Sequence, residues 1–182
     1  MYFLALVLLG YFAGGIPFGV ILANAKGVDI REHGSGNIGA TNVTRVLGAK
    51  LGAIVLVLDA AKGALPTWYA IDRVGDPWIV CAVGAATIIG HCFSPFLEFR
   101  GGKGVATATG VFLVLAPSDV AIALVVFLVV LGWKRVPALG SLAGVATLCV
   151  LTFLRGESWT ATLALGTLGL LVYTHRTNLA KL

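Results

Sequence analysis

The stretch Val105–Trp133, VATATGVFLVLAPSDVAIALVVFLVVLGW, decides how this chain folds. It is almost wholly apolar and could form one long tilted membrane helix. It could also form two short helices that break at Pro117-Ser118-Asp119, because proline followed by Ser and Asp is typical of a turn and a helix start. The two alternatives give opposite orientations to everything that follows Trp133.

The whole chain has the composition of a membrane protein. Of its 182 residues, 58% are hydrophobic and only 12% are charged, and the mean hydropathy is +0.97. A soluble domain is about one quarter charged, so this chain lacks the polar residues that would cover a surface in water. Composition therefore excludes a disordered chain, a coiled coil and a water-soluble globule. We expect residues 1–182 to form a single transmembrane helical domain.

Seven apolar runs are separated by polar turns. In chain order they are Tyr2–Ala23, Leu51–Ile71, Pro77–Phe93, Val105–Ala116, Val120–Trp133, Pro137–Leu154 and Trp159–Thr174. A membrane helix needs about 20 residues, and two of these runs are short, so we expect some short or re-entrant helices. The expected fold class is all-α, a polytopic integral membrane protein with about seven transmembrane helices.

The distribution of Lys and Arg favours seven spans over six. With seven spans and an outer N-terminus, ten of the thirteen basic residues, Lys181 included, fall in inner segments, and only Arg73 and Arg155 fall in outer loops. With six spans the division becomes seven inside and five outside. Cytoplasmic loops are enriched in Lys and Arg, so we predict a cytoplasmic C-terminus. These loops also account for the net charge of +5 without nucleic-acid binding.

The first polar cluster is Gly34-Ser35-Gly36-Asn37-Ile38-Gly39-Ala40-Thr41-Asn42, with Arg45 one turn further on. Its glycines match G-x-G-x-x-G, but a lone match is weak and no strand surrounds it, so we reject a dinucleotide fold. Glycines allow backbone amides to turn toward an anion, and a following helix adds its positive end. A phosphate site and a flexible loop capped by Thr41 or Asn42 fit the residues equally well.

Two further clusters lie on the same predicted membrane face. Phe99-Arg100-Gly101-Gly102-Lys103-Gly104-Val105-Ala106-Thr107 lacks the P-loop spacing, yet a glycine-lined turn with a lysine at a helix start suits an anion. In Thr174-His175-Arg176-Thr177-Asn178, the His and Asn are three residues apart and would share a helix face. Taken alone, each is explained by a polar turn or helix end. Together the three clusters predict an interfacial pocket for phosphate-bearing ligands.

Other polar residues are interpreted structurally. Asp59 and Lys62 lie three residues apart, about 12 Å along a helix from Leu51, where charges are usually paired. We expect a structural ion pair there and a buried or interfacial hydrogen-bonding role for His91. The three cysteines and three histidines are too scattered to predict a metal site.

Three segments resemble the signature regions of a known family, the bacterial acyl-phosphate:glycerol-3-phosphate acyltransferases of the PlsY type. They are GSGNIGATN with Arg45, GHCFSPFLEFRGGKGVAT, and HRTN, and the resemblance runs over essentially the whole chain. It implies a multi-pass enzyme of the bacterial inner (plasma) membrane, with cytoplasmic active-site loops at 25–50, 95–104 and 174–182. Such an enzyme moves a fatty acyl group from acyl phosphate to the 1-hydroxyl of glycerol 3-phosphate. The products are lysophosphatidic acid, for phospholipid biosynthesis, and inorganic phosphate.

The resemblance also implies roles for individual residues. The expected catalytic residues are His175, Asn178, Lys103 and Ser35. The expected substrate-binding residues are Gly34, Ser35, Gly36, Asn37, Thr41, Asn42, Arg45, Gly101, Gly102, Lys103, Gly104 and Ser141. No metal and no cofactor is expected. The expected partners are glycerol 3-phosphate, acyl phosphate and membrane lipids.

The residues leave the proton acceptor open. The proton of the attacking hydroxyl could pass to His175 or to a phosphate oxygen of the substrate, and we favour the second. Ser35 is disfavoured as an acylated nucleophile because no His or Lys stands beside it in the sequence. The rival function is a membrane transporter or channel for a phosphate-bearing anion, which would place polar residues near the midplane of the membrane.

Overall fold

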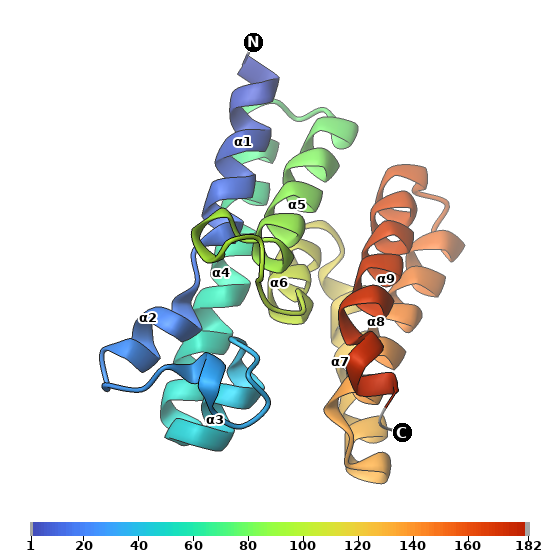
Figure 1. Cartoon of the computed structure of the whole chain (residues 1–182). Coiled ribbons are helices and arrows are strands. Elements are labelled where there is room, and N and C mark those ends of the chain that lie inside the picture. Colours follow the sequence, from blue (N-terminus) through green and yellow to red (C-terminus); the bar gives the residue numbers. More distant parts are fainter. Residues whose placement is uncertain (1, 181–182) are drawn as a thin grey trace.

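The structure is a computed structural model that describes residues 2–180, and within that range every regular element is a helix (Figure 1). The α-helices are α1 (Tyr2–Gly15), α2 (Phe18–Asn24), α3 (Ala40–Leu47), α4 (Ala49–Arg73), α5 (Pro77–Cys92), α6 (Val105–Leu115), α7 (Pro117–Lys134), α8 (Pro137–Leu154) and α9 (Ser158–Leu179). Two 3-10 turns are η1 (Ile30–Glu32) and η2 (Pro95–Leu97). Lys181, counted above among the inner charges, lies outside the described residues, as does the end of the predicted loop 174–182.

The all-helical membrane class predicted from the sequence is confirmed. Within residues 2–180, five helical segments are long and apolar enough to cross a membrane: Tyr2–Asn24, Ala49–Arg73, Pro77–Leu97, Pro117–Lys134 and Pro137–Leu154. The other two predicted runs are α6, which is apolar but has 11 residues, and α9, which has 22 residues but is not among the five. The expectation of short helices is met most clearly by α6.

The break in the stretch Val105–Trp133 is confirmed. Helix α6 ends at Leu115 and α7 begins at Pro117, where the missing N–H of proline leaves no bond unmade. Ser and Asp after a proline can also cap a helix start, but neither Ser118 nor Asp119 does so here, because the N-cap is Ala116 and no side chain caps it. Arg155 instead contacts both of them at 2.7 Å, so these two residues tie the α6–α7 turn to the α8–α9 turn.

The first apolar run, Tyr2–Ala23, lies within a candidate membrane span as predicted, but it is not one continuous helix. Helix α1 ends at Gly15 and α2 begins at Phe18, because Pro17 has no N–H to continue the ladder. Close to the break, Gly14 packs so tightly on α5 that a Cβ there would collide with the backbone of Thr87. The break leaves the carbonyl of Ile16 free to accept a hydrogen bond from Lys62 at 2.7 Å.

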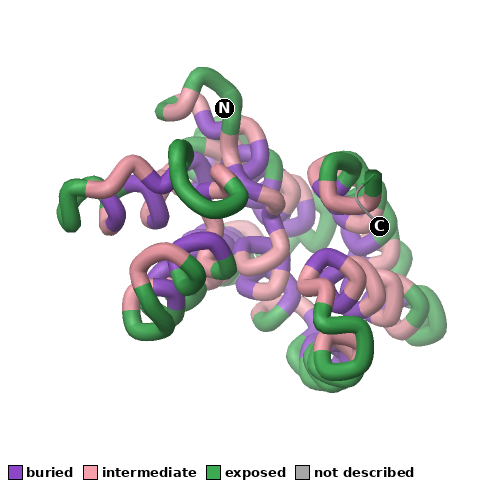
Figure 2. Tube along the Cα trace, turned by 60° about the horizontal axis from the view of Figure 1, so that its bottom comes forward, coloured by how far each residue is buried: buried purple, intermediate pink, exposed green. Residues whose placement is uncertain are grey.

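Burial follows the expected pattern of a helical bundle in lipid. Buried stretches face the interior of the bundle, and exposed stretches lie around its periphery (Figure 2). Large apolar side chains such as Trp133 and Phe153 are 75% and 73% exposed, which suits a surface that faces hydrocarbon rather than water. One buried cluster joins α5, α6, α7, α8 and α9. A second joins α2, α3 and α4 and supports the first glycine-rich loop.

Candidate functional site

A polar cavity of about 220 Å³ lies where the starts of α3, α6 and α8 meet the end of α9. Nine of the residues predicted for the site line it: Ser35, Asn37, Thr41, Arg45, Lys103, Gly104, Ser141, His175 and Asn178. Five others do not line it: Gly34, Gly36, Asn42, Gly101 and Gly102. The fold therefore brings the three polar clusters of the sequence to one cavity, although not every residue of each cluster reaches it.

The first glycine-rich loop is held together by Asn42. Its Oδ1 accepts a hydrogen bond from the amide of Ser35 at 2.8 Å. Its Nδ2 donates to the carbonyl of His33 at 2.9 Å and to that of Ile30 at 3.3 Å. The side chain is buried, and both its oxygen and its nitrogen are engaged in these hydrogen bonds. Asn42 therefore shapes the loop that presents Ser35, and the predicted direct contact with substrate does not fit this geometry.

Three of the six amides of the first loop, residues 34–39, are already paired. The amide of Gly36 donates to His33, and that of Gly39 donates to Asn37 Oδ1 at 2.8 Å. Helix α3 begins at Ala40 with Gly39 as its N-cap, so neither Thr41 nor Asn42 is the cap. The amides at the start of a helix have no partner within it. Those of Ala40 and Thr41, which both line the cavity, are therefore donors available to an anion.

The second glycine-rich loop packs against the last turn of α5. The amide of Gly101 donates to the carbonyl of Cys92 and that of Gly102 to the carbonyl of His91, each at 3.0 Å. A Cβ on either glycine would collide with this turn. Glycine is thus required here for close approach, and the anion-binding role expected for these two amides does not fit. The start of α6, at Val105 and Ala106, opens on the cavity instead.

Helix α9 fixes Lys103 from the other side of the cavity. The Lys103 ammonium donates to Asn178 Oδ1, and the Thr174 hydroxyl, the donor, lies 3.1 Å from both the Lys103 and the Leu171 carbonyl oxygens. Asn178 thus both accepts a hydrogen bond from Lys103 and lines the cavity. Thr174 was not among the residues predicted for the site. Its spacing of four residues from Asn178 places both on one helix face and was the available indication.

His175 is held in a defined tautomer. It is 2% exposed, and its Nδ1 lies 2.8 Å from the carbonyl of Leu171. A carbonyl only accepts hydrogen bonds, so Nδ1 carries the hydrogen and Nε2 of the neutral ring is an acceptor. His175 lines the cavity. The residue can therefore accept a hydrogen bond from a hydroxyl group bound there.

Arg45 and Lys103 give the cavity its positive charge. Among residues 2–180, no carboxylate forms an ion pair with either side chain. Lys103 is half-buried, and burial together with the charge of Arg45 lowers the pKa of its ammonium below the usual lysine value. Two neighbouring cations without carboxylate partners favour the binding of an anion.

Two further charged or titratable residues line the cavity. The expected ion pair of Asp59 and Lys62 is present at 2.7 Å, with both side chains 3% exposed. Asp59 also faces His91, whose Nδ1 lies 3.8 Å from Asp59 Oδ1. Asp59 and His91 line the cavity although neither was predicted for the site. Within the described residues, no three His, Cys, Asp or Glu side chains are grouped to hold a metal ion.

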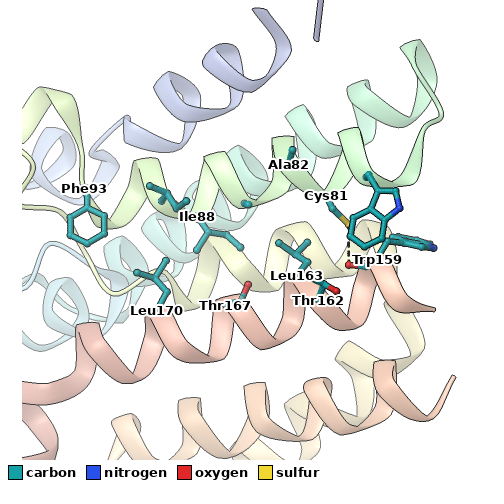
Figure 3. A pocket seen from close by; sticks show the side chains of 13 residues that line it. Cys81, Ala82, Ile88, Phe93, Trp159, Thr162, Leu163, Thr167 and Leu170 are labelled. Carbon is teal, nitrogen blue, oxygen red and sulfur yellow. Dashed lines mark hydrogen bonds between the residues drawn. The ribbon is translucent and has the colours of Figure 1, made fainter. Parts of the chain in front are cut away.

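An apolar groove of about 550 Å³ continues from the cavity. It lies among α3, α4, α6, α7 and α8, and it shares Thr41, Leu56, Val105, Phe127 and Ser141 with the cavity. A separate apolar groove of about 540 Å³ lies between α5 and α9 (Figure 3), where the Cys81 thiol contacts the carbonyl of Trp159 at 3.5 Å. This second groove shares no lining residue with the cavity.

This chain is similar in sequence and fold to glycerol-3-phosphate acyltransferases. The sequence model of the glycerol-3-phosphate acyltransferase family matches residues 4–182. The glycerol-3-phosphate acyltransferase of Myxococcus xanthus (strain DK1622) is 51% identical over 181 residues, which cover 98% of this chain and 94% of that protein. The enzyme of Aquifex aeolicus (strain VF5) is 40% identical over the same coverage.

Two solved structures agree with the sequence relatives. Both are crystal structures of PlsY (YgiH), an integral membrane glycerol 3-phosphate acyltransferase, and both are 39% identical to this chain. The glycerol 3-phosphate form matches with a TM-score of 0.96 and covers 100% of this chain and 92% of that one. The lysophosphatidic acid form matches with a TM-score of 0.94 over 100% and 91%. This chain therefore belongs to the glycerol-3-phosphate acyltransferase family of integral membrane enzymes.

Proposed function

We propose that this acyltransferase takes its acyl group from an acyl phosphate and transfers it to the 1-hydroxyl of glycerol 3-phosphate. The products are lysophosphatidic acid, for phospholipid biosynthesis, and inorganic phosphate. One observation carries the proposal: a single cavity presents two helix starts and two cations without carboxylate partners, and an apolar groove leads out of it. The likeness to PlsY structures in glycerol 3-phosphate and lysophosphatidic acid forms supports it.

Each glycine-rich loop offers one set of anion-binding groups. The start of α3 with Arg45 is one set, and the start of α6 with Lys103 is the other. Helix N-termini and guanidinium or ammonium groups both favour phosphate. Two substrates that each carry a phosphate would fill both sets. In an acyl phosphate the phosphate is bonded to the reacting carbonyl, so binding it in either set also brings that carbonyl into the cavity.

The apolar groove suits the acyl chain of the donor. Its lining is apolar apart from a few small hydroxyl residues, and Leu56 and Phe127 stand where the groove joins the cavity. A chain lying in the groove would be removed from water while its carbonyl and phosphate remain among the polar groups. We assign the groove to the acyl chain of acyl phosphate and of the lysophosphatidic acid product.

The reaction needs positioning more than an enzyme nucleophile. The hydroxyl oxygen of glycerol 3-phosphate attacks the carbonyl carbon, a new ester C–O bond forms, and the C–O bond to phosphate breaks. Arg45, Lys103 and the helix starts stabilise the negative charge of the transition state. No His or Lys side chain within residues 2–180 hydrogen-bonds to the Ser35 hydroxyl, so we assign Ser35 a polar contact with substrate rather than an acyl-enzyme.

We propose that the hydroxyl proton passes to an oxygen of the leaving phosphate. His175 Nε2 accepts a hydrogen bond from the hydroxyl and orients it for attack. The variant His175→Ala should then lower kcat and keep the acidic limb of the pH–rate profile. Loss of that limb in His175→Ala, with its retention in wild type, would make His175 the base instead.

We place the cavity on the cytoplasmic side of a bacterial inner membrane. The chain would then be one transmembrane domain whose active site is built from loops 25–50, 95–104 and 174–182. Helix α3 and the C-terminal end of α9 lie at the end of the molecule opposite the N-terminus (Figure 1). The excess of Lys and Arg in the segments at this end supports the orientation.

The donor is tested by product analysis with the purified protein in detergent or a lipid mesophase. Glycerol 3-phosphate is supplied with palmitoyl phosphate, palmitoyl-CoA or palmitoyl acyl carrier protein, and the products are identified by mass spectrometry. We expect lysophosphatidic acid when palmitoyl phosphate is the donor, and none when the donor is palmitoyl-CoA or palmitoyl acyl carrier protein. Equal product from palmitoyl-CoA would overturn the proposed donor while leaving the acyltransferase family intact.

A further inference from the structure

His91 occupies a buried position behind the second glycine-rich loop. It lies in the last turn of α5, is 4% exposed and lines the cavity. Its Nδ1 has no hydrogen-bond partner among the described residues, although it faces Asp59 Oδ1 at 3.8 Å. A buried imidazole without a full set of hydrogen bonds costs stability, so its presence beside the cavity calls for a functional explanation.

The other edge of the imidazole presses on Gly102. A Cβ on Gly102 would collide with His91 Nε2, and the Gly102 amide donates to the His91 carbonyl at 3.0 Å. The next residue is Lys103, whose carbonyl is held from the opposite side by Thr174. The peptide that carries the Lys103 side chain is therefore clamped between the His91 ring and α9.

Asp59 is a rigid support for the ring. Its carboxylate pairs with Lys62 at 2.7 Å, and Lys62 Nζ also donates to the carbonyl of Ile16 at 2.7 Å. The Lys62 ammonium lies 5.6 Å from the centre of the Phe18 ring as well. A buried carboxylate that moved would leave a buried charge unpaired, which is strongly unfavourable. A fixed chain of contacts thus runs from the break between α1 and α2, through Lys62 and Asp59, to His91.

We propose that His91 is a positioning residue for Lys103. Its ring, wedged between Asp59 and Gly102, sets the Gly102–Lys103 peptide so that the Lys103 ammonium meets the phosphate of a substrate. This role rests on the proposed function, in which Lys103 binds phosphate. It requires no contact between His91 and the reacting atoms, and it explains why the loop has glycine rather than alanine at position 102.

The contact is tested by a double-mutant cycle between His91 and Gly102. Gly102→Ala forces its methyl group into the ring, and His91→Ala removes the ring. A displacement of about 1 Å at a reacting group costs up to roughly a hundredfold in rate, so we expect about tenfold lower kcat/KM in His91→Ala and about a hundredfold in Gly102→Ala. In the double variant the new methyl occupies the space of the lost ring. Its kcat/KM should match that of His91→Ala. Losses that multiply instead would overturn the contact.

A second double-mutant cycle, between His91 and Lys103, tests whether His91 acts through Lys103. If His91 acts through Lys103, then His91→Ala should lower kcat/KM by less than about twofold in a Lys103→Ala background. A full tenfold loss in that background would show that His91 acts by another route and would overturn the proposal. A Lys103→Ala variant with wild-type kcat/KM would instead refute the phosphate role of Lys103 in the proposed function.

A control experiment checks that each of these variants is folded. Thermal unfolding in detergent reports whether each variant is native, and Ile89→Ala, on the same helix but 43% exposed and outside the cavity, is the matched control. If His91→Ala does not fold, His91→Asn takes its place in both cycles, because it keeps a polar group toward Asp59 and removes the contact with Gly102. Wild-type kcat/KM in a folded His91→Asn would overturn the proposal.

Discussion

The two glycine-rich loops have similar composition but are held in different ways. In the first, Gly34 and Gly36 adopt left-handed backbone angles, with φ of 62° and 69°. The side-chain oxygens of Asn42 and Asn37 accept hydrogen bonds from the amides of Ser35 and Gly39. In the second, Gly101 and Gly102 donate to carbonyls of α5 and must lack a Cβ, which would collide with the α5 backbone at Gly101 and with the His91 ring at Gly102. One loop needs glycine for conformation, and the other needs it for space.

Both loops nevertheless end in the same arrangement. Each leads into a helix whose first turn lines the cavity, and each supplies one cation there, Arg45 from α3 and Lys103 from the start of α6. The anion-binding capacity therefore resides in the two helix starts and the two cations. The glycines place these groups, and most of their own amides are bonded elsewhere.

The largest expected effect comes from removing either cation. Arg45→Ala and Lys103→Ala should each lower kcat/KM by about a hundredfold or more, because each deletes a charged contact in a partly enclosed site. Arg45→Lys and Lys103→Arg keep the charge and should retain more activity. If only one of the two alanine variants lost activity, the equivalence of the two loops would be broken.

A smaller and unequal effect is expected for glycine substitutions in the two loops. In Gly101→Ala the new Cβ meets the carbonyls of His91 and Cys92, which cannot move away, and we expect roughly a hundredfold lower kcat/KM. In Gly34→Ala it meets Asn42 Oδ1, a side-chain atom that can shift by weakening its hydrogen bond to the Ser35 amide, so a smaller loss of about tenfold is expected. Gly27→Ala, with positive φ but no neighbour within 4 Å, is the control for backbone strain alone. Equal losses of kcat/KM in Gly101→Ala and Gly34→Ala would contradict the idea that one loop needs glycine for close approach and the other for its backbone angles.

The asparagines of the first loop should affect stability in proportion to their hydrogen bonds. Asn42→Ala removes three bonds inside a buried loop, and we expect about 2–3 kcal/mol of destabilisation. Asn37→Ala removes one and should cost about 1 kcal/mol. Chemical or thermal unfolding in detergent measures both. An Asn37→Ala variant that is the less stable of the two would contradict the assignment of Asn42 as the support of this loop.

The smallest effect is a dependence of KM on alkaline pH. Burial and the Arg45 charge lower the pKa of Lys103 below its usual value of 10.5, so the ammonium loses its proton earlier as pH rises. A bound phosphate favours the charged form, so KM for the substrate at this loop should rise a few-fold at alkaline pH. Lys103→Arg should abolish the rise because arginine stays charged. A rise that persists in Lys103→Arg would assign it to another group.

Much of the fold follows from the sequence because it depends on local apolar runs. The break at Pro117 could be predicted from a proline in a long apolar stretch and from the positions of Lys and Arg. The break between α1 and α2 was missed, although Pro17 was a visible indication, because the run remained apolar on both sides. An apolar run therefore predicts that a segment lies in the membrane, but it does not predict that the segment is one continuous helix.

The site could be predicted less completely because it depends on contacts between distant segments. The three clusters are recognisable from residue type, and nine of the residues predicted for the site line the cavity. The engagement of the Gly101 and Gly102 amides by α5, and the hydrogen bond from Thr174 to Lys103, join residues that only the tertiary fold brings together. Asp59 and His91 were interpreted as structural residues, because nothing in the sequence indicates that they line the same cavity as Lys103.

The most direct test of the two-loop account is phosphate release from palmitoyl phosphate by the purified protein, with and without glycerol 3-phosphate. If each loop binds one phosphate, release should require both substrates and should collapse in Arg45→Ala and in Lys103→Ala. Release without glycerol 3-phosphate would identify a hydrolase of acyl phosphates. An absence of release from folded wild-type protein would contradict the account and favour transport of a phosphate-bearing anion.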